Sequence, residues 1–176
     1  RRQRQMCIRD RFMFMKINNK AYGFTITLIE YEETIPTLWD HTKQFMKLHP
    51  DYFASDNLVE FVIDNGDFET SNYNLCHFWS NFEIGDINFF RSKQYKDYFE
   101  YLDKTGGFFY ERWGDAPVHS IAASLFLNKS QVYHFKDIGY VHDGMGHCPL
   151  GEKQFHENGK CDCNVVDSVT PVSYTH

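Results

Sequence analysis

The stretch YGFTITLI at residues 22–29 decides the fold class, because it predicts the first strand of a sheet. Phe24, Ile26 and Leu28 would share one face of this strand, and two threonines the other. Such a period of two is typical of a half-buried strand. A helical pattern follows directly, so strands and helices are expected to alternate along the chain, as they do in α/β proteins.

The helix after this strand is predicted to begin near Thr34, which can cap it, with Pro36 in its first turn. It should end before Pro50, which cannot continue a helix. From Gly139 onward the pattern is typical of a loop. The other predicted elements are an aromatic strand over residues 76–90 broken by Gly85, a helix from Ser92 to Gly106, a helix opened by Asp115 and a last strand over residues 132–135.

Composition and charge argue against two classes of protein. The chain has 176 residues, 42% of them hydrophobic, which is enough to form one globular core. Its formal net charge is −6 and its basic residues are scattered, whereas a nucleic-acid-binding protein needs a basic face. No run of about 18 apolar residues could span a bilayer. A membrane anchor is therefore expected only outside this sequence, and no nucleic acid is expected as a partner.

The two ends of the sequence differ from the rest. Residues 1–11 are rich in arginine and show neither a strand period nor a helix period. The last six residues, PVSYTH, resemble the same kind of translated adapter sequence. We therefore expect residues 1–11 and 168–176 to be non-native read-through and residues 12–167 to carry the fold. Ordinary frayed termini are the alternative.

Polar groups among aromatic residues mark the candidate site. The segment NFEIGD places Asn81 and Glu83 between large apolar side chains, where a carboxylate is costly unless it has a partner or a chemical task. Glu83 is therefore a candidate catalytic residue, with a salt bridge as the alternative. In FFYERWGDAP, Arg112, Trp113 and Asp115 again stand among aromatic residues. Capping of the following helix is the alternative for Asp115.

Histidines and cysteines gather near the C-terminus, where they could bind a metal ion. Their spacing fits no standard zinc-finger pattern. Pairing of Cys161 with Cys163 would strain the ring that it closes, so Cys148 is expected to pair with one of these two. An even number of cysteines in the folded region is compatible with two disulfides: Cys76, Cys148, Cys161 and Cys163.

Six long strings occur in a fixed order: NNKAYGFT, IPTLW, CHFWSNFEIGD, NFFRS, YFEYLDKTGGFFYERWGDAPVHSIAASLFL and IGYVH. Over residues 12–167 they resemble the fungal α-1,2-mannosyltransferases, the glycolipid 2-α-mannosyltransferase family (glycosyltransferase family fifteen). The resemblance implies the C-terminal part of a catalytic domain with the glycosyltransferase-A fold, a mixed sheet flanked by helices. It also implies retaining transfer of mannose from GDP-mannose to a mannose-terminated glycan acceptor, with Mn²⁺, by a type II membrane protein of the Golgi lumen.

The resemblance assigns roles to single residues. Glu83 would be the nucleophile or would stabilise an oxocarbenium-like centre, because retention requires a negative group on that face of the sugar. His142 of IGYVH would bind Mn²⁺. Asp115 would face the sugar or the acceptor. The residues expected to contact substrate are Asn81, Arg112, Trp113 and Asp115.

One motif of the family does not occur here. Its acidic metal motif, a Glu-Pro-Asp, stands upstream of the NNK string, and neither it nor an Asp-x-Asp is found in this sequence. The half that first binds the donor is therefore expected to be missing, and the chain is expected to be inactive alone. In a Golgi protein the four cysteines above are expected to be oxidised. A catalytically silent luminal module that binds glycan or a partner, and a small zinc-binding protein, are the alternatives.

Overall fold

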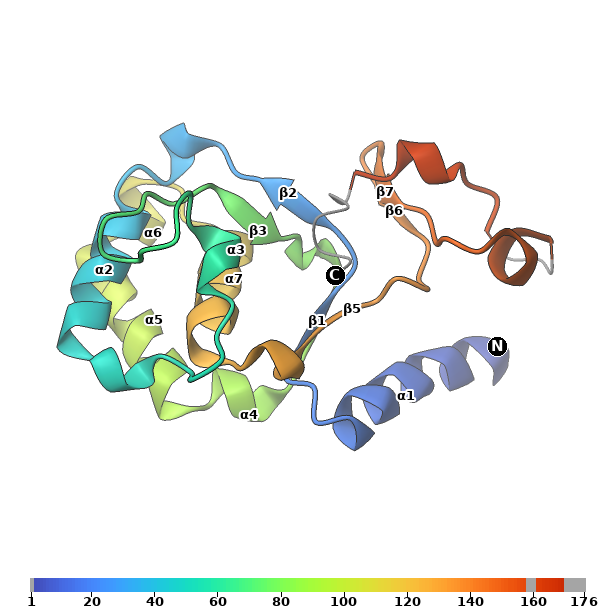
Figure 1. The fold of residues 1–176 in the computed structure, drawn as a ribbon, viewed down its shortest axis with the longest axis horizontal. Coiled ribbons are helices and arrows are strands. Elements are labelled where there is room, and N and C mark those ends of the chain that lie inside the picture. Colours follow the sequence, from blue (N-terminus) through green and yellow to red (C-terminus); the bar gives the residue numbers. More distant parts are fainter. Residues whose placement is uncertain (1, 158–160, 170–176) are drawn as a thin grey trace.

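The described residues, 2–157 and 161–169, form three small sheets with helices packed around them (Figure 1). The structure is a computed structural model, and the PVSYTH segment at residues 171–176 lies outside the described residues. The helices are α1 Arg2–Ile17, α2 Leu38–Leu48, α3 Val59–Val62, α4 Ile87–Phe90, α5 Lys93–Thr105, α6 Gly107–Tyr110 and α7 Asp115–Phe126. The strands are β1 Tyr22–Phe24, β2 Thr27–Ile29, β3 Cys76–Phe78, β4 Glu83–Gly85, β5 Val132–His134, β6 Tyr140–His142 and β7 Met145–His147.

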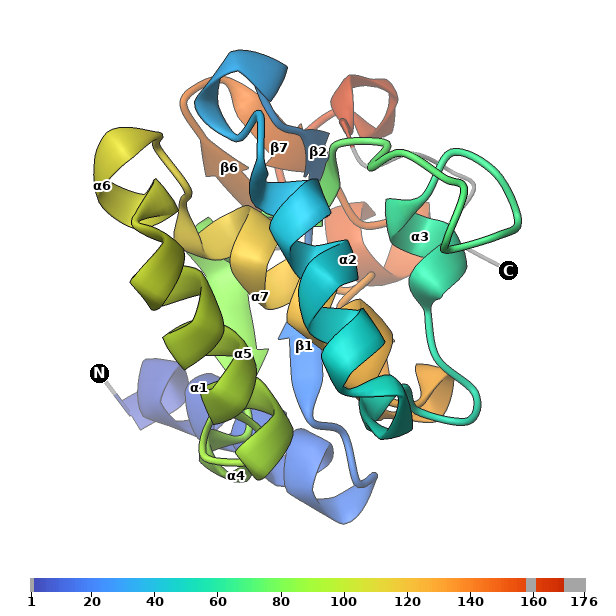
Figure 2. The same ribbon diagram turned by 90° about the vertical axis from the view of Figure 1, so that its left-hand side faces the viewer.

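The central sheet has the strand order β4-β1-β5 and is mixed, because β1 runs antiparallel to β4 and parallel to β5. A second sheet pairs β2 with β3, and a third pairs β6 with β7, both antiparallel. Helices α2, α5 and α7 gather on one side of β1 (Figures 1 and 2), and α7 packs against β3. The predicted α/β class, with a mixed sheet flanked by helices, is confirmed.

The strand predicted over residues 22–29 is two strands in different sheets. β1 joins the central sheet and β2 turns away to pair with β3. The prediction of a half-buried strand is also wrong, because Thr25 is fully buried and Thr27 is 3% exposed. Aromatic side chains cover this segment: the Phe24 ring stacks between Phe78 at 4.2 Å and His134 at 5.0 Å.

Helix α2 begins four residues later than predicted. A separate 3₁₀ turn, Glu32–Thr34, precedes it, and Thr34 does not cap the helix. The proline explains the shift, because a residue before proline is kept out of the helical region, and Ile35 has φ −137° and ψ 37°. The helix ends at Leu48, before Pro50, as predicted.

Helix α5 matches its prediction at both ends. The Ser92 hydroxyl accepts a hydrogen bond from the Tyr95 amide at 3.2 Å, the geometry of an N-cap. Gly106 ends the helix with φ 82°, in the left-handed region that favours glycine. Helix α7 begins at Asp115, as predicted, but Gly114 occupies the N-cap position.

The segment after Gly139 is not the loop that the sequence predicts, because β6 and β7 form a hairpin there. Asp143 and Gly144 connect the two strands with φ 51° and 78°. Two consecutive residues with positive φ match the twist of a two-residue hairpin, and Asp-Gly is a favoured pair for it. The Asp-Gly pair therefore marked a hairpin turn in the sequence, although the many histidines, glycines and cysteines around it suggested a loop.

Residues 2–11 contribute most of helix α1, although the sequence shows no helical period there. Its described contacts lie toward the C-terminal end. Arg11 Nη1 pairs with Asp137 Oδ2 at 2.6 Å, the Phe14 ring lies 4.6 Å from the Tyr133 ring, and Met15 is buried. That residues 1–11 and 168–176 are non-native stays a prediction.

Candidate active site

Two cavities are lined in part by residues on or next to the segment that joins β3 to β4. The larger cavity, of about 1050 Å³, is lined by Phe82 and Glu83 together with residues of the β6–β7 hairpin and the C-terminal loop. The smaller cavity, of about 340 Å³, is lined by Trp79, Asn81 and Asp115 among others. The two cavities therefore separate the predicted site residues: Glu83 is among the residues that line one cavity, and Asn81 and Asp115 are among those that line the other.

Glu83 sits in β4 with its side chain 22% exposed and its carboxylate held by two neighbours. The Tyr22 hydroxyl donates to Oε2 at 2.5 Å. The His119 Nδ1 lies 3.1 Å from Oε1 and 3.2 Å from Oε2. The strand register explains the tyrosine contact. Tyr22 pairs with Gly85, two residues beyond Glu83, so both side chains point to the same face of the sheet.

The pKa of the Tyr22 hydroxyl is raised well above its ordinary value, first because the side chain is buried and second because the Glu83 charge opposes a phenolate. The hydroxyl therefore stays protonated and donates to the carboxylate. Neither Tyr22 nor His119 was a predicted site residue. A sequence signal existed for His119, because it follows Asp115 by four residues and so lies on the same face of α7.

The smaller cavity is lined by Asp115 and Asn81 together with the aromatic residues Tyr31 and Trp79. Asp115 is exposed at the first turn of α7, where the helix dipole favours a negative charge, and its Oδ1 accepts from the Ala116 amide at 2.9 Å. Asn81 is exposed, and its backbone carbonyl accepts a hydrogen bond from the Tyr140 hydroxyl at 3.3 Å. His77 also lines this cavity, and burial lowers its pKa.

Arg112 and Trp113 line neither of these two cavities. Trp113 is 5% exposed and packs in the core, where its Nε1 donates to Glu111 Oε2 at 2.6 Å. The Thr37 hydroxyl donates to the same carboxylate at 2.5 Å, which joins the start of α2 to the segment before α7. Arg112 is exposed. The structure therefore gives Trp113 a packing role, which sequence reasoning did not assign.

His142 is exposed at the end of β6, and its ring meets the Trp79 ring edge-on at 5.4 Å. It is a possible Mn²⁺ ligand by chemistry, but it belongs to no group of three metal-binding side chains in the described part of the chain. One neutral imidazole does not supply the ligand number or the charge that holds Mn²⁺. The described residues therefore do not form a complete metal site.

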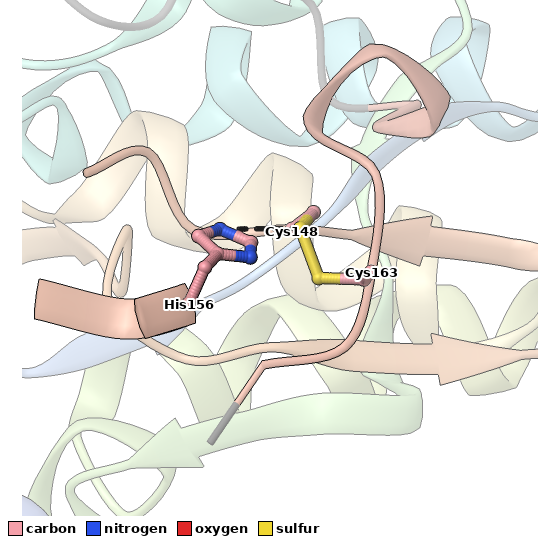
Figure 3. A group of neighbouring side chains, drawn as sticks. All are labelled: Cys148, His156 and Cys163. Atoms are coloured by element: carbon pink, nitrogen blue, oxygen red, sulfur yellow. Dashed lines mark hydrogen bonds between the residues drawn. A yellow bond between two sulfur atoms is a disulfide. The ribbon is translucent and has the colours of Figure 1, made fainter. Parts of the chain in front are cut away.

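The group of metal-capable side chains in the described ranges is Cys148, His156 and Cys163, whose ligand atoms lie within 4.8 Å of one another (Figure 3). Cys148 and Cys163 form a disulfide, so neither sulfur is a thiolate that could bind zinc. The predicted pairing of Cys148 with Cys161 or Cys163 is confirmed. The prediction that all four cysteines are oxidised is wrong for this structure, because Cys76 and Cys161 are free thiols.

Comparison with known proteins identifies the family. Residues 7–175 match the family model described as glycolipid 2-alpha-mannosyltransferase. The chain belongs to this family. It is 53% identical over 166 residues to glycolipid 2-alpha-mannosyltransferase 2 of Candida albicans and 55% identical over 160 residues to the O-glycoside alpha-1,2-mannosyltransferase omh1 of Schizosaccharomyces pombe. These alignments cover 94% and 91% of the chain but 35% and 40% of the relatives.

Solved structures confirm the glycosyltransferase-A type of fold. Core-mannan synthase A from Aspergillus fumigatus, in its Mn/GDP form, matches with a TM-score of 0.80 and 44% identity, over 93% of this chain and 44% of that one. The mannosyltransferase Ktr4p of Saccharomyces cerevisiae in complex with GDP matches with a TM-score of 0.80 and 42% identity, over 92% and 42% of the two chains. None of the helices in the described ranges is long and apolar enough to cross a bilayer.

Proposed function

We propose that the protein containing this chain is a retaining α-1,2-mannosyltransferase that moves mannose from GDP-mannose to a mannose-terminated glycan in protein glycosylation. Family membership and the activities of the relatives support the reaction class. The observation that carries the proposal is the partly buried Glu83 carboxylate, which two neighbours, Tyr22 and His119, hold in place.

Glu83 would act on the anomeric carbon of the donor mannose. Retention needs a negative group on the face opposite the leaving diphosphate, either as nucleophile or as electrostatic stabiliser of an oxocarbenium-like centre. The partly buried carboxylate suits this task, because charge interactions strengthen where water is excluded. Its two hydrogen-bond donors fix its orientation before the substrate binds.

The smaller cavity suits the acceptor mannose. Asp115 and Asn81 offer groups that hydrogen-bond sugar hydroxyls, and Trp79 offers an apolar ring face. We assign acceptor binding to these residues. Arg112 stays a proposed contact at the exposed surface, whereas Trp113 supports the site by fixing Glu111 and the start of α7.

Mn²⁺ is the proposed cofactor, and when bound it would neutralise the diphosphate that leaves. His142 would contribute one ligand. Because the described residues do not complete the metal site, no step of the reaction is derived through the ion. We place the protein in the Golgi lumen as a type II membrane protein. The Cys148–Cys163 disulfide supports this placement, since disulfides persist in oxidising compartments.

The proposed role of Glu83 is tested by Glu83→Gln in the full-length protein. This change keeps the shape of the side chain and removes its charge, so kcat for mannose transfer should fall about 100-fold or more while GDP-mannose binding stays near normal. Transfer is measured with a mannoside acceptor and donor binding by calorimetry. Glu100→Gln, at an exposed position of α5, is the control and should leave both quantities unchanged.

The same assay separates the rival function. A catalytically silent glycan-binding module would bind mannosides but transfer nothing, with or without Glu83. Near-normal kcat in Glu83→Gln would instead leave Glu83 as a structural ion-pair partner of His119.

A further inference from the structure

We propose that His119 is a positioning residue that orients the Glu83 carboxylate for reaction by donating a hydrogen bond from Nδ1. This inference rests on the proposed mannose transfer, in which Glu83 acts on the sugar. His119 does not line the larger cavity, so it would act through Glu83 and not on the substrate itself.

The distances between the two side chains indicate that His119 orients the Glu83 carboxylate. Nδ1 is almost equally distant from the two carboxylate oxygens, 3.1 Å from Oε1 and 3.2 Å from Oε2. An ionised carboxylate only accepts hydrogen bonds, so Nδ1 must carry the hydrogen. The Tyr22 hydroxyl adds a second donor at Oε2 alone. One donor would leave the carboxylate free to rotate about its last bond, whereas two donors from different elements fix its plane.

The imidazole is itself held in place. Its ring lies 5.0 Å from the Phe90 ring and 6.0 Å from the Tyr95 ring, and its side chain is 20% exposed. The next residue, Ser120, accepts from the Phe78 amide at 2.7 Å and donates to the Ala116 carbonyl at 2.6 Å. Helix α7 is thereby tied to β3, five residues before Glu83, so the helix that carries His119 is joined to the strand that leads to Glu83.

A structural ion pair is the competing explanation for the contact. Both side chains are about four fifths buried, and the imidazole also packs on two aromatic rings, so its removal should cost some stability whichever explanation holds. A reacting group that is displaced by about 1 Å, in contrast, can lose a factor of about 100 in rate. The two explanations therefore differ in the kcat of the folded variant: removing the imidazole would lower stability under both, but only loss of a positioning residue would lower kcat.

The kinetic test compares His119→Ala and His119→Asn in the full-length protein. The alanine variant should lose about 10- to 100-fold in kcat, with KM for GDP-mannose within about twofold of wild type. The asparagine amide nitrogen sits close to the place of Nδ1 and should restore most of the loss. The control His49→Ala removes another partly buried histidine, which packs on Phe45 and Tyr52, and should keep wild-type kcat. Wild-type kcat in His119→Ala, or equal losses in the alanine and asparagine variants, would overturn the proposal.

A second readout does not depend on activity. Nitrogen-15 NMR of the imidazole rings should show His119 protonated at Nδ1, with a signal that shifts in Glu83→Gln. An unprotonated Nδ1 in the wild type would refute the hydrogen bond and the proposal with it. A wild-type protein that transfers no mannose would refute the proposed function instead, and the NMR result would still decide whether His119 holds Glu83.

Discussion

At position 85 a side chain would occupy the space that the Phe90 ring fills. A Cβ built on Gly85 would lie 2.3 Å from Phe90 Cε2, and Phe90 cannot easily yield because it packs against Tyr95 and His119. Gly85→Ala should therefore lower the free energy of unfolding by about 1–3 kcal/mol, as overpacking does. Urea denaturation measures it. The matched control is Gly66→Ala, where a Cβ would meet nothing within 4 Å; equal stability of the two variants would contradict this account.

His134 gives the stability a dependence on pH. Burial lowers its pKa from 6.5 to about 4, although its Nε2 donates to the Thr25 carbonyl at 3.0 Å. Lys136 and the nearby His147 ring also disfavour protonation. The unfolded chain therefore binds the proton at a higher pH than the folded protein, and the free energy of unfolding should fall as pH drops from 6.5 toward 4.

The effect of His134 on the pH dependence of stability has an upper limit. One fully shifted histidine contributes at most about 1.4 kcal/mol per pH unit, and partial exposure of the His134 ring reduces it. Urea denaturation at several pH values should show a shallower slope in His134→Gln, whose amide can still donate to the Thr25 carbonyl but cannot titrate. An unchanged slope would assign the effect to other groups, such as His147, whose pKa burial also lowers.

The sequence pointed to Glu83 but not to the residues that hold it. A carboxylate among aromatic side chains is recognisable, because its burial needs a reason. Its partner His119 is 36 residues away, and Tyr22 is 61 residues away. The spacing of apolar residues shows which face of a helix or strand is buried, but it does not show which distant element packs against that face. Only the fold brings these three residues together.

At the scale of elements, helix α7 packs against β3 and is also hydrogen-bonded to it through the Ser120 hydroxyl. Ser120→Ala would leave the buried Phe78 amide without its acceptor, which should cost about 1–3 kcal/mol of unfolding free energy. Ser124, one turn later, is equally buried, and its hydroxyl has no hydrogen-bond partner in the described part of the chain. Ser124→Ala is therefore the matched control and should be near neutral. Thermal unfolding of both variants would reveal the difference, and similar losses would argue against a role for this hydrogen bond.

Elements whose first and last residues are recognisable capping residues were predicted well. Helix α5 carries both signals in its own sequence, with Ser92 at the start and Gly106 at the end. The break between β1 and β2 has no such local sign, because it depends on two different partners, β4 and β3. The late start of α2 was readable from Pro36 in principle, but the capping pattern at Thr34 was the stronger local signal.

At the scale of the whole molecule, the predicted inactivity of the isolated chain becomes a test of the metal site. His142 is the proposed Mn²⁺ ligand within residues 2–157 and 161–169, and it carries no charge when it binds a metal. The 176-residue chain alone should therefore transfer no mannose from GDP-mannose with Mn²⁺ present, and its affinity for GDP should be weak. The assay is run beside a full-length relative. Robust transfer by the chain would show that its own residues complete the site.

The Cys148–Cys163 disulfide has a practical consequence for anyone who produces this protein. Reduction would release two thiols beside the His156 ring, and all three ligand atoms lie within 4.8 Å. Two thiolates and an imidazole are soft ligands that zinc and copper favour. Material made in a bacterial cytosol, or purified in reducing buffer over an immobilised metal column, would therefore carry a scavenged ion in its C-terminal loop. Metal analysis of such a sample would then report on the history of the preparation and not on the proposed Mn²⁺ cofactor.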